Sequence, residues 1–202
     1  MSDLARVAAA LGAASSVAVL AHIKPEGDAI GSTLAATLAL RAAGKRTAAF
    51  NADRVPPELL ELPGAGEVRR VVPADRDYGV YLVVDTANLG RTGGLLDGRR
   101  PGTLVVNVDH HGGNTRFGDV NWVEPEASSA GEMVLRLIRT MGLPISPDVA
   151  ANLYAAILTD TGGFRYGNTT VAALRAAADL VDAGAVPDAI ARGFSAHRVV
   201  GE

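Results

Sequence analysis

The sequence contains no cysteine among its 202 residues. This excludes disulfide bonds and thiolate-bound zinc, so a bound metal ion must be held by carboxylate oxygens and imidazole nitrogens. There is also no apolar run near the roughly 18 residues that a membrane-spanning helix needs. No block of like charge occurs and the net charge is -3. This weak negative charge argues against a dedicated binder of long nucleic acid.

The N-terminus lacks the pattern of a signal peptide. Residues 8–14 are apolar, but Asp3 and Arg6 precede them and a predicted strand follows at once. We therefore expect a soluble, cytoplasmic protein. Hydrophobic residues make up 48% of the sequence, enough for a full core, and the length fits one sizeable domain with at most a fragment of another.

Short apolar runs alternate with helical patterns along most of the chain. Continuous apolar strands separated by helices are typical of a parallel sheet that is covered on both faces. The fold class predicted is therefore α/β, with a parallel sheet sandwiched by helices. The predicted strands are residues 17–22, 46–50, 80–84 and 103–108, and the predicted helices are residues 28–43, 129–141, 147–158, 170–183 and 187–202.

Acidic residues and histidines gather where these elements end. In open parallel α/β sheets, ligands bind beyond the carboxyl ends of the strands, so these side chains are candidates for one site. They follow three of the strands and one helix, and are His22, Glu26, Asp28, Asp85, Asp109, His110, His111 and Asp160.

Four of the acids, Glu26, Asp28, Asp85 and Asp160, would bring four negative charges into a shared pocket. Like charges about 4 Å apart repel by about 1 kcal/mol in water and by several times more near protein. Two divalent cations would balance these carboxylates while the imidazoles stay neutral. Oxygen ligands mixed with imidazole suit Mn²⁺ or Mg²⁺. If these residues converge, the sequence predicts a dinuclear metal site.

The same residues lie in four motifs that resemble, in order, those of the DHH phosphoesterase superfamily. Within it, the chain is most similar to the bacterial oligoribonuclease/pAp phosphatases of the nanoRNase A type. The motifs span most of the chain, which makes them far more specific than a single Asp-His-His triplet. They are residues 22–32, residues 85–91, Asp109-His110-His111 with Gly112 and Gly113, and residues 159–165.

The resemblance implies a role for each motif residue. His22, Glu26 and Asp160 would hold one metal ion, Asp28 and His110 would hold the other, and Asp85 would bridge the two. Two such ions can activate a water molecule and stabilise both the attacking and the leaving oxygen. We expect Mn²⁺, with Mg²⁺ as the alternative.

The remaining motif residues would act on the substrate. Together with Asp85 and His110, the catalytic set would include His111, facing the phosphate, and Asp109, orienting an imidazole from behind. Arginine suits bidentate contact with phosphate, and glycines allow close approach to the backbone. The predicted substrate contacts are therefore Arg91, His111, Gly112, Gly113 and Arg165.

The implied activity is hydrolysis of phosphoester bonds in short oligoribonucleotides and 3′-phosphoadenosine 5′-phosphate (pAp). The products would be nucleoside monophosphate or phosphate. Two alternatives stay open: a family II type inorganic pyrophosphatase, and a non-catalytic nucleotide-binding domain. Family members commonly associate through this kind of domain, so a homodimer is a further expectation.

The sequence departs from the family pattern in two places. Glu26 stands where the family usually has aspartate, and its extra methylene moves the carboxylate by about one bond. The family also usually continues into a smaller substrate-binding domain, which nothing here resembles. We therefore predict a DHH catalytic domain over residues 1–186 and the start of an interdomain linker helix over residues 187–202. The C-terminal domain is expected to be absent because the chain is truncated.

Several candidates have structural alternatives. Asp28 could be the N-cap of the helix that follows it, and Glu26 could be a solvated carboxylate in a turn. The run 168–170 is expected to form a helix N-cap. His197 is expected to play no part in the site.

Overall fold

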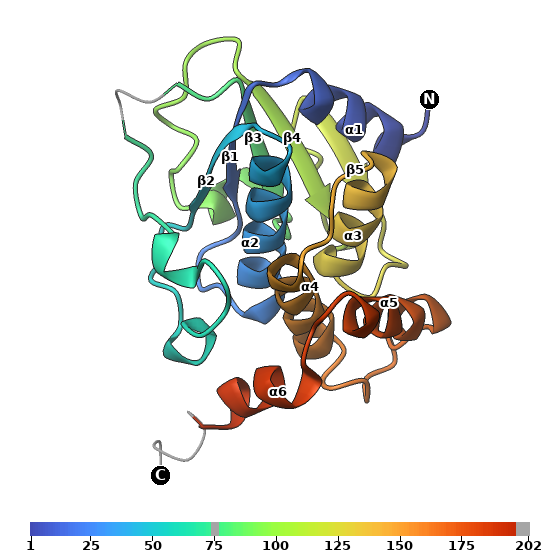
Figure 1. Ribbon diagram of the computed structural model, residues 1–202. Helices are drawn as coiled ribbons and strands as arrows, with labels where there is room; N and C mark the ends of the chain where they lie inside the picture. Colours follow the sequence, from blue (N-terminus) through green and yellow to red (C-terminus); the bar gives the residue numbers. More distant parts are fainter. Residues whose placement is uncertain (74–76, 197–202) are drawn as a thin grey trace.

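The computed structural model describes residues 1–73 and 77–196. Within them, a five-stranded parallel sheet has the strand order β2-β1-β3-β4-β5. The helices α4, α5 and α6 lie below this sheet in the view of Figure 1. The strands are β1 (Ser16–Leu20), β2 (Arg46–Phe50), β3 (Val80–Val84), β4 (Leu104–Asp109) and β5 (Val120–Val123).

Six α-helices and three short 3₁₀ helices accompany the sheet in the described ranges. The α-helices are α1 (Asp3–Ala13), α2 (Gly27–Ala42), α3 (Ala130–Thr140), α4 (Pro147–Asp160), α5 (Val171–Asp182) and α6 (Pro187–Ala196). The 3₁₀ helices are η1 (Pro57–Leu59), η2 (Ala65–Glu67) and η3 (Leu89–Thr92). The part of the last predicted helix beyond residue 196, with His197, lies outside the described residues.

The predicted α/β class with a parallel sheet is confirmed, and β2 and β3 coincide with their predicted ranges. Sequence analysis missed α1 and β5. The strand β5 pairs only with β4 at the sheet edge, and three of its four residues are partly exposed. Such a strand lacks the continuous apolar run by which buried strands are recognised.

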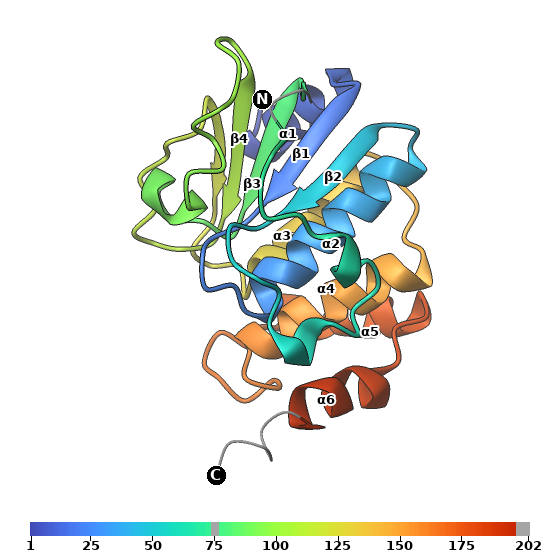
Figure 2. The ribbon, with the colours of Figure 1, turned by 90° about the vertical axis from the view of Figure 1, so that its left-hand side faces the viewer.

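The two faces of the sheet are covered differently. One face presents Val19, Leu82 and Val106 to a core that includes apolar residues of α1 to α5. The opposite face presents Leu20 and Val83 to a smaller cluster drawn from strands and loops. Figure 2 shows α2 and α4 to the right of the sheet and the green loops with η3 to its left.

The predicted parallel sheet flanked by helices is confirmed, with the α-helices packed on one face and loops with η3 on the other. The connection between β3 and β4, which provides Leu95 and Leu96 to the cluster on the second face, carries residues that interrupt α-helices. The segment from 90 to 102 holds five glycines and one proline. Proline and repeated glycine disfavour an α-helix, so loops and the short η3 take its place.

Two glycines bring α2 unusually close to α4. A Cβ atom at Gly31 would lie 2.4 Å from the carbonyl oxygen of Asn152. A Cβ atom at Gly27 would lie 2.5 Å from side-chain atoms of Thr159. Because both glycines face α4, the first turn of α2 lies beside the last turn of α4.

The strand order reverses between β1 and β3. The chain leaves β1 toward β2 on one side and then crosses to β3 on the other side. In open α/β sheets this switch point leaves a crevice at the carboxyl edge, where ligands bind. His22 follows β1 and Asp85 follows β3, so both lie at this crevice.

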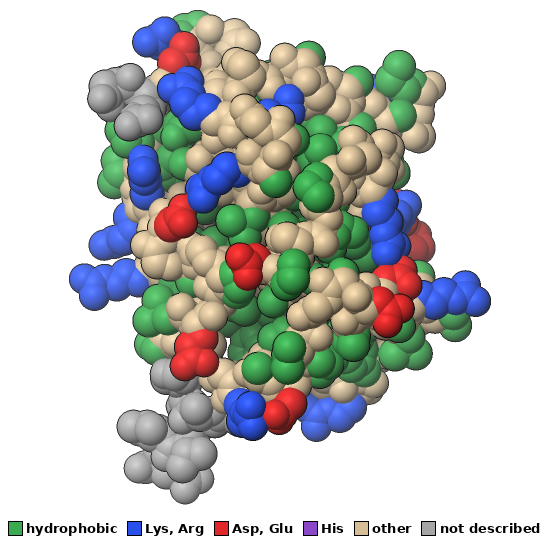
Figure 3. Space-filling view, in the orientation of Figure 1, with side chains coloured by type: hydrophobic (Ala, Val, Ile, Leu, Met, Phe, Trp, Pro, Cys, Tyr) green, Lys and Arg blue, Asp and Glu red, His purple; other side chains and the backbone are tan. Residues whose placement is uncertain are grey.

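The helix α6 folds back against the body of the domain. It packs on η1 and α4, and its Ile190 and Phe194 join an apolar cluster with Leu59 and Leu62. On the face seen in Figure 3, apolar side chains gather in the lower half, and no histidine is visible. Within the described ranges, no helix is both long and apolar enough to cross a membrane.

Candidate metal centre

The structure brings all six predicted metal ligands together at the carboxyl edge of the sheet. In each of three groups, the potential ligand atoms lie within 4.8 Å of one another. Two of these groups share Asp85, and two share His110. The groups are His22, Glu26 and Asp85; Asp28, His110 and Asp160; and Asp85, His110 and His111.

Asp85 lies at the centre of the cluster and is only 2% exposed. Its Oδ2 is 3.2 Å from His22 Nε2, and its Oδ1 is 3.5 Å from His110 Nε2. This Oδ1 atom is buried and has no hydrogen-bond partner. A buried carboxylate oxygen without a partner is costly unless a cation satisfies it. The position of Asp85 between the two histidines therefore fits a carboxylate that bridges two metal ions.

Glu26 combines a structural contact with a place beside His22. Its carboxylate accepts hydrogen bonds from the backbone N–H groups of Asp28 (2.8 Å) and Ala29 (3.0 Å), so Glu26 is the N-cap of α2. Its Oε1 also lies 3.6 Å from His22 Nε2. The carboxylate is about half exposed, but both of its oxygens accept hydrogen bonds from the start of α2.

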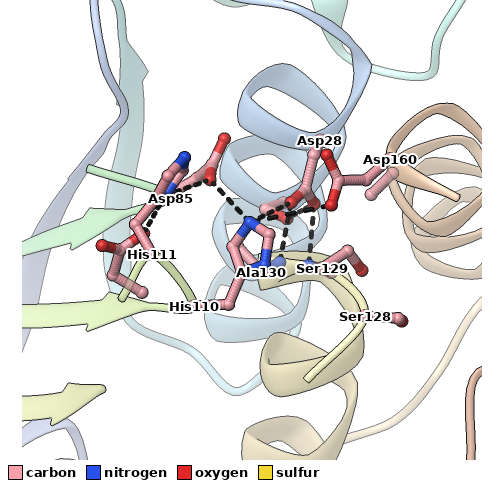
Figure 4. Close-up of polar contacts among 12 residues, drawn as sticks. Asp28, Asp85, His110, His111, Ser128, Ser129, Ala130 and Asp160 are labelled. Atoms are coloured by element: carbon pink, nitrogen blue, oxygen red, sulfur yellow. Dashed lines mark hydrogen bonds and ion pairs between the residues drawn. The ribbon is translucent and has the colours of Figure 1, made fainter. Parts of the chain in front are cut away.

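Asp28 does not cap its own helix, as the structural alternative proposed. It is fully buried and binds the N-terminus of α3 instead (Figure 4). Its Oδ2 accepts a hydrogen bond from Ala130 N (2.7 Å), and its Oδ1 accepts one from Gly131 N (2.8 Å). The partial positive charge of a helix N-terminus stabilises a carboxylate there. This contact fixes Asp28 between two helices.

His110 lies beside two acidic residues, one on α2 and one on α4. Its Nε2 is 3.8 Å from Asp28 Oδ2 and 3.7 Å from Asp160 Oδ2, and Figure 4 shows it between these groups and Asp85. Asp160 is the last residue of α4, and the close packing of α2 and α4 places it beside Asp28. The structure thus groups Asp160 with Asp28 and His110, whereas the resemblance implied a group with His22 and Glu26.

Asp109 supports His111 from behind. Its Oδ1 accepts a hydrogen bond from His111 Nδ1 at 2.8 Å, and the carboxylate is fully buried. Its Oδ2 accepts another from Asn114 Nδ2 at 2.6 Å, and the same amide contacts Asn107. The arrangement fixes the ring of His111, whose Nε2 remains for a ligand. Sequence analysis did not find the role of Asn114, because it lies in a loop five positions after Asp109.

Asn168 connects the end of α4, where Asp160 lies, to the segment that precedes α3. Its side-chain amide donates to the backbone carbonyls of Ser128 (2.9 Å) and Asp160 (3.1 Å). The N-cap of α5 is Thr170, whose hydroxyl accepts from Ala173 N. The predicted N-cap at residues 168–170 is therefore correct for Thr170, while Asn168 joins the end of α4 to the start of α3.

The shared pocket shifts the pKa values of the cluster strongly. Burial lowers the pKa of His22, but contacts with Asp85 and Glu26 outweigh this effect and raise it to about 10. His110 behaves alike, and Asp85 with Asp28 raises its pKa to about 9. Burial raises the pKa of Asp85, yet the two histidines bring it down to about 2. Burial raises the pKa of Asp160 to about 6. Positive charge is thus strongly favoured among these acids, and metal ions can supply it in place of protons.

A cleft of about 880 Å³ opens in front of the cluster. The predicted substrate residues Arg91, Arg165 and His111 line it, whereas Gly112 and Gly113 lie in an exposed turn and are not among the lining residues. Arg91 Nη2 is 2.9 Å from His22 Nδ1. Other lining residues had no role assigned from the sequence, among them Lys24, Leu59, Tyr166 and Phe194. Lys24 lies within the first motif and Tyr166 directly follows the fourth, whereas Leu59 and Phe194 lie outside all four motifs.

Fold and site together define an α/β protein with a candidate dinuclear metal centre at the switch point of a parallel sheet. The model of the "DHH family, N-terminal domain" matches residues 16–157. The chain therefore belongs to the DHH family, as the four motifs predicted.

Curated relatives of the chain carry names that describe two activities. The chain is 38% identical over 168 residues to the "Bifunctional oligoribonuclease and PAP phosphatase NrnA" of Thermus thermophilus. The alignment covers 82% of this chain and 49% of that protein. It is 32% identical to the Bacillus subtilis protein of the same name, over 79% of this chain and 50% of the relative. The chain thus spans about half the length of these relatives.

Solved structures support the fold. An exopolyphosphatase-related protein from Bacteroides fragilis is similar with a TM-score of 0.86 and 27% identity, over 95% of this chain and 59% of that one. A putative family II inorganic pyrophosphatase from Methanococcus jannaschii has a TM-score of 0.67 at 20% identity, over 89% and 60% of the two chains. This second likeness concerns the fold alone.

Proposed function

We propose that this chain is the catalytic part of a two-metal phosphoesterase that hydrolyses short oligoribonucleotides and pAp. The buried Oδ1 of Asp85 carries the proposal, because it has no hydrogen-bond partner and lies 3.5 Å from His110 Nε2, where a shared metal ligand is expected. The names of the Thermus thermophilus and Bacillus subtilis relatives support the substrate class. A small substrate also agrees with the weak net charge of -3.

The residues divide naturally into two metal sites that share Asp85. His22 and Glu26 would complete one site, and Asp28, His110 and Asp160 would form the other. Oxygen and imidazole ligands of this kind fit Mn²⁺, with Mg²⁺ as the alternative. When bound, the two ions would supply an activated water and Lewis-acid stabilisation of the reacting oxygens.

The rest of the site would bind and orient the substrate phosphate. Arg91 and Arg165 line the cleft and are suited to bidentate phosphate contact. The hydrogen bond to Asp109 raises the pKa of His111 and so favours its protonated form. With Nδ1 committed to Asp109, protonated His111 can donate from Nε2 to a phosphate oxygen. Asp109 and Asn114 keep that ring in place.

The domain boundary near residue 186 is part of the proposal. The helix α6 begins at Pro187, after a short turn that follows α5 and contains Gly184 at a positive φ. Its residues Ala191 and Phe194 line the cleft. We propose that residues 1–186 form the catalytic domain and that α6 is the start of an interdomain linker helix. Association into a homodimer and a cytoplasmic location belong to the proposal as well.

The decisive test compares Asp85→Asn with the wild-type chain. This change keeps the shape of the side chain but removes the charge of the shared ligand. We expect Mn²⁺ binding, measured by calorimetry, to weaken strongly. The rate of hydrolysis of pAp and pApA should fall by at least roughly 100-fold, because metal ions supply several kcal/mol of transition-state stabilisation. The control is Asp182→Asn at the exposed end of α5, which should leave both unchanged.

Pyrophosphate is assayed beside the two nucleotides. If pyrophosphate were the best substrate, the pyrophosphatase alternative would replace this proposal. If wild-type chain took up no Mn²⁺ at all, the alternative of a non-catalytic nucleotide-binding domain would stand instead.

A further inference from the structure

A hydrogen-bonded turn follows α4 and forms one side of the cleft. The carbonyl oxygen of Thr161 accepts from both Arg165 N (2.9 Å) and Tyr166 N (3.0 Å), and its hydroxyl accepts from Phe164 N (3.1 Å). Gly162 and Gly163 have φ values of +59° and +71°. Because these bonds hold the backbone of the turn, its exposed side chains are presented to a ligand at a low cost in conformational entropy.

The side chains of the turn point in two directions, one toward the core of the domain and two toward solvent. Phe164 points into the domain, where its ring packs edge-on against Tyr154 at a centroid distance of 6.0 Å. Arg165 and Tyr166 point outward and line the cleft. Arg165 is held by a hydrogen bond from its Nε to the carbonyl oxygen of Gly162 at 2.7 Å. The turn thus presents a guanidinium group and an aromatic ring next to each other.

Tyr166 differs from the other tyrosines of the chain. Tyr78, Tyr81 and Tyr154 are at most 8% exposed, whereas Tyr166 is 61% exposed. Its ring rests on the backbone of Gly162, where an added Cβ would lie 2.4 Å from Cζ. Gly162 leaves room for this close approach of the ring, and its φ of +59° lies in the region that favours glycine. The ring of Tyr166 therefore lies against Gly162, and most of its remaining surface is exposed at the cleft.

Both polar and apolar side chains line the cleft. The cluster around Asp85 contributes charged groups, and Leu59, Leu158 and Phe194 contribute apolar ones. An aromatic ring beside an arginine matches a nucleotide, in which a flat base is joined to a phosphate. Stacking of a base on an aromatic ring contributes about 1–3 kcal/mol and tolerates any base, since every base has a π-face.

We infer that Tyr166 forms a nucleobase subsite, in which the base stacks on its ring while Arg165 contacts a phosphate. This inference rests on the proposed function and deepens it. Pyrophosphate, which has no base, would make no use of the exposed ring. Tyr166 would therefore set the preference for nucleotides over base-free phosphates.

The test uses pAp and its abasic analogue, a sugar 3′,5′-bisphosphate without adenine, with the full chain in Mn²⁺. We expect Tyr166→Ala to raise KM for pAp roughly tenfold, within the range that loss of one stacked base produces, and to leave KM for the abasic analogue unchanged. Tyr166→Phe should stay within about twofold of wild type, because stacking needs the ring and not the hydroxyl. Leu174→Ala on the exposed face of α5 is the matched control.

A binding measurement separates this inference from the proposed function. Calorimetry compares AMP with ribose 5-phosphate for the wild-type chain and for Tyr166→Ala. Loss of the preference for AMP in the variant supports the subsite even if the wild-type chain hydrolyses neither substrate, a result that would refute the proposed function alone. An active wild type whose Tyr166→Ala variant keeps its full preference for AMP overturns the subsite alone. Equal losses in KM for pAp and its abasic analogue overturn it as well.

Discussion

Asp85 shows how one residue can indicate a metal centre without a metal in view. It follows a fully buried strand and is only 2% exposed, and its Oδ1 has no hydrogen-bond partner. Histidines approach it from two other segments of the chain. Both oxygens of Asp28, by contrast, accept hydrogen bonds from backbone N–H groups at the start of α3. The contrast between these two buried acids supports a bridging role for Asp85.

The raised pKa values of His22 and His110 predict how metal binding depends on pH. At about 10 and 9, both lie above the ordinary 6.5, so both rings are protonated at neutral pH without metal. A metal ion binds the neutral ring and must displace the proton. Apparent affinity for Mn²⁺ should therefore rise between pH 6 and 9, by about tenfold per pH unit for each proton displaced.

Proton release is measured by calorimetry of Mn²⁺ binding in buffers of different ionisation enthalpy. The variant His110→Gln should release fewer protons than wild type. An affinity that does not change with pH would contradict the prediction. The same raised pKa values stabilise the metal-free fold fully below about pH 6.5, and this contribution is lost as the pH rises through about 9 to 10.

At the scale of elements, the packing of α2 on α4 determines the spacing of Asp28 and Asp160. We predict that Gly31→Val destabilises the fold by about 2 kcal/mol or more, because its Cβ would meet the backbone oxygen of Asn152 at 2.4 Å. Urea unfolding measures the effect. Mn²⁺ affinity should fall in the same variant, since the two helices must move apart.

Gly12→Ala in α1 is the matched control for this change. An added Cβ at Gly12 meets nothing within 4 Å, so its stability should change by less than about 1 kcal/mol. If Gly31→Val were as stable as Gly12→Ala and bound Mn²⁺ normally, the close contact of α2 with α4 would have no part in forming the site.

At the scale of the whole molecule, the candidate metal centre draws its residues from both the sheet and the helical layer. His22, Asp85 and His110 follow strands, while Asp28 and Asp160 belong to α2 and α4. Mn²⁺ at about 100 times its dissociation constant should stabilise the chain by about 2.7 kcal/mol. For a domain of this size, that corresponds to a rise in Tm of roughly 5–10 °C.

Thermal unfolding with Mn²⁺ and after its removal by a chelator measures this rise. The variant Asp85→Asn should show little of it, because the shared ligand is altered. A Tm that does not respond to Mn²⁺ in the wild-type chain would show that the cluster does not hold the ion.

The sequence by itself determined the α/β class, the central strands and which acidic and histidine side chains are candidates for one site. Apolar runs such as residues 80–84 and the motifs that follow them are local, and parallel strands carry their ends to one edge whatever the details of packing. The tertiary structure alone decided the grouping of Asp160, the cap at Glu26 and the loop cover on one face. It also decided the exposure of Tyr166 in the cleft. These features depend on how close α2 comes to α4 and on which residues meet across the fold, and neither is encoded in a local pattern.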